Sequence, residues 1–100
     1  MYRATTPTHI FTLPFETSLL KTFQITYKQF DTIILQKTKE DCTLTDKAIK
    51  LELTQEETLL FKPTALVYIQ LRVVTNEGRV LASEIEKKWP KECLDEGVLE

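Results

Sequence analysis

The chain contains very little glycine and histidine. Gly78 and Gly97 are its two glycines, and His9 is its sole histidine. Loops that cradle phosphates need several backbone amides that a ligand can approach closely, so the sequence excludes a glycine-rich nucleotide site. A Ser/His/Asp triad, a Cys/His dyad or a multi-histidine metal site cannot be assembled without His9. We therefore expect no enzyme, with no catalytic, cofactor-binding or metal-binding residue, and we interpret His9 as a surface imidazole.

Cysteine and long apolar runs are also scarce. Cys42 and Cys93 are the two cysteines, and they lie too far apart for a CxxC pair or a common metal-ligand spacing. This pattern favours two free thiols in a reduced compartment, although a disulfide between them stays open. No stretch of about 18 apolar residues occurs, and residues 1–8 carry no apolar run of signal-peptide length. We expect no membrane contact and a location in the cytoplasm, and assembly into a particle that leaves the cell by lysis stays open.

The composition is that of one ordinary globular domain. The 100 residues are 42% hydrophobic and 28% charged, and the formal net charge is −2. Charges of both signs are scattered along the chain, so we expect no strongly positive surface potential that would attract nucleic acid. The carboxylate pairs, such as Glu56 with Glu57, are better explained as solvated faces or a helix start than as acid/base machinery.

The clearest structural signal lies between residues 65 and 85. Side chains alternate with a period of two, as in a strand with one buried face, and residues 75–78 then form a hairpin turn. Gly78 supplies the positive φ that such a turn needs. The predicted inward side chains are Val67, Ile69, Leu71 and Val73, and the outward ones are Tyr68, Gln70 and Arg72.

Further strands are predicted at residues 10–13, 23–28, 32–36, 42–44 and 49–53. Thr54 followed by Glu57 is a capping box and predicts one helical turn near 54–61, which Pro63 ends. The pattern favours an all-β fold, a two-sheet immunoglobulin-like β-sandwich of six to seven strands with that helical turn and a short C-terminal helix. We expect the sandwich domain at 1–86 and a loosely held tail at 87–100.

Three segments together resemble a known group of proteins. They read TTPTHIFTLPF at residues 5–15, LTQEETLLF at 53–61 and IQLRVVTNEGRVLASEI at 69–85. They resemble small uncharacterised prophage proteins of Gram-positive bacteria and are similar to the N-terminal β-sandwich modules of phage baseplate and receptor-binding-region proteins. The resemblance implies a non-enzymatic structural or assembly module, a virion or baseplate component or an adaptor. Its partners would be other phage structural proteins and a second copy of the chain.

Two surfaces are candidate protein contacts, and two other functions stay open. Edge strands offer free backbone groups, and an apolar outer stripe can meet a neighbouring subunit. A small carbohydrate- or ligand-binding sandwich is the alternative, with Trp89 and Tyr68 as aromatic platforms. A hydrolase with an unrecognised site ranks third. The predicted interaction residues are Thr8, Ile10 and Thr12 on the edge strand, and Tyr68, Gln70 and Arg72 on the outer stripe.

Overall fold

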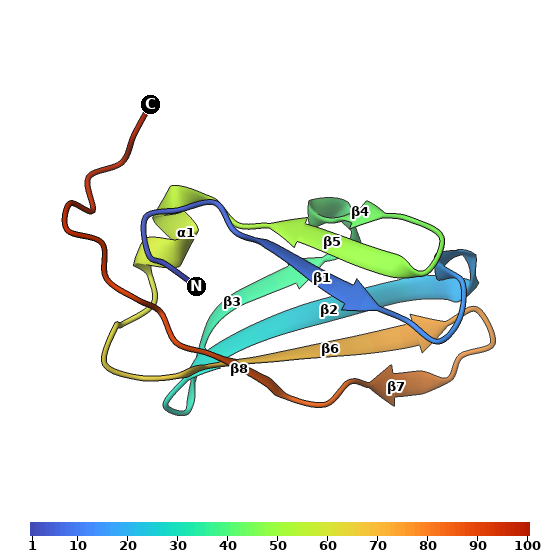
Figure 1. The fold of residues 1–100 in the computed structure, drawn as a ribbon. Helices are drawn as coiled ribbons and strands as arrows, with labels where there is room; N and C mark the ends of the chain where they lie inside the picture. The colour runs from blue at the N-terminus through green and yellow to red at the C-terminus, as the bar shows by residue number, and fades with distance from the viewer.

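The computed structural model describes residues 1–100 and shows two antiparallel sheets packed face to face (Figure 1). The predicted all-β sandwich is therefore confirmed. One layer is a three-stranded sheet and the other a five-stranded sheet. The strands are β1 (Thr8–Thr12), β2 (Leu20–Gln29), β3 (Thr32–Thr38), β4 (Thr43–Leu44), β5 (Ala48–Glu52), β6 (Val67–Thr75), β7 (Val80–Ala82) and β8 (Glu86–Lys88). The helical segments are the 3-10 turns η1 (Thr17–Leu19) and η2 (Lys39–Asp41) and the helix α1 (Gln55–Leu59).

The strand order is that of an immunoglobulin-like domain. One sheet runs β1-β5-β4, and the other runs β3-β2-β6-β7 with β8 also paired to β6. In immunoglobulin domains the first sheet contains strands B, E and D, and the second contains C′, C, F and G. The two orders coincide when β1 is taken as strand B. Within residues 1–100 no strand pairs with the outer edge of β1, which is where strand A lies in that fold.

The core lies between the two sheets and is centred on the β2–β6 pair. Ile25 faces Leu71 across this pair, and Tyr27 faces Ile69. The inward positions of β6 are buried, as the alternation predicts. The 14 core side chains are Phe11, Leu13, Leu20, Phe23, Ile25, Tyr27, Ile49, Leu51, Leu53, Phe61, Val67, Ile69, Leu71 and Val73.

The crossover between the sheets begins with the predicted helical turn. Thr54 accepts a hydrogen bond from the Glu57 amide at 3.1 Å, and the Glu57 carboxylate accepts one from the Thr54 amide at 2.9 Å. This capping box forms as predicted and starts α1. Glu57 also forms an ion pair with Lys37 of β3. Burial raises the pKa of the Glu57 carboxyl, but the hydrogen bond and charge of Lys37 and the bonds to Thr54 outweigh it and lower the pKa overall.

The end of the chain differs from the sequence-based expectation. The predicted short C-terminal helix is wrong, since the residues after β8 are extended or irregular. The chain there runs beside the N-terminus, where the Lys91 amide donates to the Met1 carbonyl at 2.7 Å and the Arg3 amide donates to the Lys91 carbonyl at 2.8 Å. These long-range bonds hold the segment extended, and Pro90 has no amide for a helix. The sheet also continues through β8, past the expected boundary between residues 86 and 87.

Candidate functional site

The outer edge of β1 carries unpaired backbone groups. The Leu13 amide bonds to the Lys47 carbonyl at 2.7 Å, and the Leu53 amide bonds to the Pro7 carbonyl at 3.0 Å. Together with the β1–β5 register, these bonds show that every second residue of the segment from Pro7 to Leu13 forms its backbone hydrogen bonds with β5. The N–H and C=O groups of the alternate residues therefore point away from β5. Those alternate residues are Thr8, Ile10 and Thr12, the three predicted on the edge strand.

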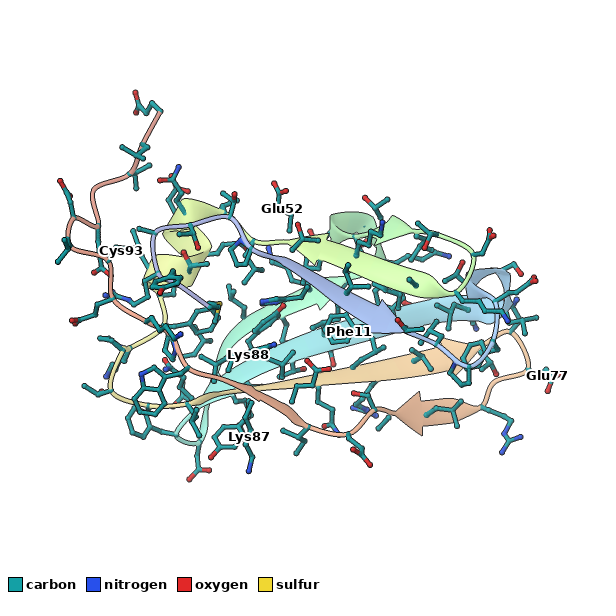
Figure 2. The ribbon with its side chains drawn as sticks, in the orientation of Figure 1. Phe11, Glu52, Glu77, Lys87, Lys88 and Cys93 are labelled. Carbon is teal, nitrogen blue, oxygen red and sulfur yellow. The ribbon has the colours of Figure 1, made fainter.

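The side chains of this edge are exposed and uncharged. Thr8 and Thr12 are exposed, and Ile10 is 56% exposed. Between them the side chains alternate inward, with Phe11 lying between the two layers (Figure 2). A strand edge without charge, proline or bulge has none of the common protections against pairing with another strand.

An apolar groove opens beside this edge. Its volume is about 620 Å³, and it lies between β1 and the segment that follows β1 on one side and β6 and β7 on the other. Glu86 is its one charged lining residue. Its apolar lining includes Phe11, Leu13 and Phe15 on the first side, and Leu71, Val73 and Leu81 on the second. The groove is the lateral opening of the sandwich at the position of an immunoglobulin strand A.

The opposite rim of the groove is interrupted at Ser83. The Ser83 amide donates to the Leu71 carbonyl at 2.8 Å, and its hydroxyl accepts from the Leu71 amide at 3.0 Å. The Gln70 side chain donates to the Ser83 carbonyl at 2.9 Å. Ser83 thus holds the chain against β6 in the gap between β7 and β8. Because each of these strands has only three residues, β1 is the longer strand edge beside the groove.

The predicted outer stripe is separate from the β1 edge. Tyr68, Gln70 and Arg72 lie on β6, which is paired on both sides, so they have no free strand edge. Tyr68 is 37% exposed and has the Lys87 ammonium 5.8 Å from its ring centroid. The stripe faces out from the five-stranded sheet, whereas Thr8 and Thr12 lie on the three-stranded sheet. The structure therefore does not bring the two predicted contacts together.

His9 is not a surface imidazole. Its Nδ1 lies 2.6 Å from the hydroxyl oxygen of Tyr27, and the two rings stack with centroids 5.6 Å apart. Burial, with smaller effects of Lys88 and the N-terminal amine, lowers the pKa of His9 to about 4. Burial, followed by Cys42, Glu57 and Glu86, raises the pKa of Tyr27. The tyrosine hydroxyl therefore donates to a neutral imidazole at neutral pH, and this pair ties β1 to β2 across the core.

No cluster of three or more His, Cys, Asp or Glu side chains could hold a metal ion. Both cysteines are free thiols, and the Cys93 thiol donates to the Arg3 carbonyl at 3.1 Å. None of the helical segments has the length and apolar character needed to cross a membrane.

Comparisons with protein-family models, with curated proteins and with solved structures find no match to this chain. The strand order and the groove define the class of the protein, an immunoglobulin-like β-sandwich with an open strand edge beside an apolar groove.

Sequence reasoning found the edge but missed the groove. The lining residues Phe15, Leu81 and Glu86 come from segments that meet only after the two sheets have packed. The available signal was Phe15, an aromatic residue placed directly after Pro14 and outside any predicted strand. An aromatic residue there has to pack against something beyond its own strand.

Proposed function

We propose that the protein is a non-enzymatic structural or assembly module of phage origin that acts through protein–protein contacts made by the open edge of β1. The observation that carries the proposal is the set of outward backbone groups at Thr8, Ile10 and Thr12 beside an apolar groove. Extended segments bind such edges by adding a strand, with affinity from main-chain hydrogen bonds and specificity from side-chain pockets. The resemblance of three segments to phage baseplate modules supports the phage setting.

The chemistry of the groove supports contact rather than catalysis. The Ser83 hydroxyl already bonds to the Leu71 amide and to the Glu84 carbonyl. His9 Nδ1 is bonded to Tyr27, which is fully buried. A hydrolase needs a nucleophile and a base within hydrogen-bonding reach of each other. The Ser83 hydroxyl and the His9 imidazole are instead each bonded to other groups.

Particle incorporation tests the proposal. In the strain that carries the gene, prophage induction followed by density-gradient purification should place the protein in the particle band or in an assembly intermediate, as measured by mass spectrometry. Ile10→Lys should remove it from that band. Ile33→Lys is the matched control, since Ile33 is an exposed isoleucine (51%) on β3. Absence of the wild-type protein from every particle fraction, or equal loss with both variants, contradicts the proposal.

A small-ligand or carbohydrate-binding module is the second candidate, because the groove volume of about 620 Å³ lies in the range of ligand pockets. The groove is mostly apolar, which favours an apolar ligand. Trp89 is half-exposed and Tyr68 is covered in part by Lys87, so neither forms an open sugar platform with the groove. Stoichiometric binding of a fluorescent apolar dye that Leu81→Glu abolishes, in a protein missing from particles, would favour this alternative.

A further inference from the structure

We infer that the strand added to β1 is β1 of a second copy of this chain, paired antiparallel about a two-fold axis at Ile10. This inference rests on the proposed role of the β1 edge as a contact surface and names the partner. Three observations carry it: the symmetry of the edge, its lack of charge, and the position of the groove.

The outward residues of β1 read the same in both directions. They are Thr8, Ile10 and Thr12, so an antiparallel second copy centred on Ile10 places threonine opposite threonine and isoleucine opposite isoleucine. These are also the residues whose N–H and C=O groups point away from β5. All three cross-strand pairs are then hydrogen-bonded pairs, which gives about six backbone hydrogen bonds. Such a contact is isologous, as a two-fold dimer requires.

Charge does not oppose this pairing. The β5 residue next to Ile10 is Lys50, and the residue next to Thr8 is Glu52, which points away from the other sheet (Figure 2). In the dimer the two Lys50 positions are three strand spacings apart, roughly 14 Å. That separation exceeds the Debye length of about 8 Å at physiological salt. Like charges therefore do not meet across the axis.

The other strand edges are protected in ways that β1 is not. The β2–β3 pair has a register shift between Tyr27 and Lys28, which bends that edge. The residues of β8 are Glu86, Lys87 and Lys88, and all are charged. The remaining edges, β4 and β7, have only two and three residues. The longer edge strand β3 also has uncharged exposed residues, but its pairing carries that register shift, whereas β1 combines five residues with an uninterrupted register.

The added strand also covers the groove. It would lie about 4.8 Å beyond β1, on the side where the groove opens toward β7. Ile10 and Thr12 line that opening, so the second copy buries exposed apolar surface there as well as pairing backbone groups. The two grooves then face each other across the axis and close together.

Sedimentation equilibrium on the full chain tests the dimer. We expect a reversible monomer–dimer equilibrium, and Ile10→Lys should raise its Kd at least about tenfold because two lysines would then be directly opposed. Ile33→Lys is the matched control and should leave the Kd unchanged. Circular dichroism of both variants checks that each still folds. A wild-type chain that stays monomeric to the highest soluble concentration overturns the inference.

Cysteine cross-linking tests the register independently. In a background with Cys42 and Cys93 replaced by serine, Ile10→Cys places two thiols on a hydrogen-bonded pair whose Cα atoms are about 5.5 Å apart, within disulfide range. Mild oxidation should then give covalent dimers. Thr8→Cys alone should give none, because its partner position is Thr12 of the second copy. Equal cross-linking of both variants overturns the two-fold axis at Ile10.

The outcomes separate this inference from the proposed function. If the protein is monomeric and enters particles, but its Ile10→Lys variant does not, the proposed function is supported and the second copy is refuted. Another protein then supplies the strand. A dimer with the predicted register that enters no particle supports the second copy and refutes the assembly role.

Discussion

Replacing Gln29 with leucine should strongly destabilise the sandwich. Gln29 is 1% exposed at the end of β2. Its amide nitrogen donates to the carbonyls of Lys62 at 2.7 Å and Ala65 at 2.9 Å, and its oxygen accepts from the Lys62 amide at 2.7 Å. One side chain thus satisfies three backbone groups of the loop that carries the chain from α1 to β6. Leucine is close in size and removes all three hydrogen bonds.

The size of the effect follows from these three bonds. An intramolecular hydrogen bond contributes about 1 kcal/mol net, and a buried group left without a partner costs about 1 to 3 kcal/mol. Water can reach part of the loop, so we expect Gln29→Leu to lower the free energy of unfolding by about 3 kcal/mol. Urea denaturation followed by far-ultraviolet circular dichroism measures this difference. Gln24→Leu, a half-buried change on the same strand, is the control and should stay within about 0.5 kcal/mol of the wild type.

A second variant at this position separates the bonds from the packing. Gln29→Glu keeps the acceptor for the Lys62 amide but directs a carboxylate oxygen at two carbonyls, which raises the pKa of the new acid in the folded state. A group with a raised folded pKa contributes its stability below the unfolded pKa and loses it as pH rises through the folded value. Relative to wild type, Gln29→Glu should therefore be more stable at pH 4 than at pH 7. A loss below about 1 kcal/mol for Gln29→Leu, or no pH dependence for Gln29→Glu, would refute the reasoning.

Three smaller effects are expected elsewhere. Thr54→Ala should lower the free energy of unfolding by about 1 kcal/mol, because it removes the cap of α1, and urea denaturation measures it. Gly78→Ala should lower the free energy of unfolding by about 1 kcal/mol in the same assay. Gly78 has φ +86 and open space where a Cβ would lie, so the loss comes from backbone strain and not from a steric clash. The pKa of His9 is lowered to about 4, so the unfolded chain binds the proton first and stability should fall as pH drops from about 6.5 to about 4. After allowance for solvent screening this loss is about 1 to 2 kcal/mol, and His9→Gln should lack it; a pH-independent wild type between those values would contradict the assignment.

The elements that could be predicted are those whose signal is local. The alternation along β6 and the spacing of Thr54 and Glu57 both act within a few residues, and both structures form as expected. The edge position of β1 also has a local signal, since Pro7 and Pro14 flank it. The role of that edge as a contact stays a prediction.

The elements that were missed depend on contacts between distant segments. His9 is in phase with Phe11 and Leu13, so its inward direction could have been deduced, but Tyr27 as its partner follows only from the packing of the sheets. The C-terminal segment carries a weak helical pattern, and its bonds to Met1 and Arg3 override that pattern. The groove is lined by residues from both sheets, so it forms only when the two sheets pack together.

Amide hydrogen exchange at Ile10, followed by NMR at increasing protein concentration, tests the central claim most directly. We expect the His9 and Phe11 amides to be protected at every concentration, because they pair with β5. The Ile10 amide should exchange fast in dilute solution and become protected as the second copy adds its strand. An Ile10 amide that exchanges equally fast at all concentrations, or that is already protected in dilute monomer, would contradict the account.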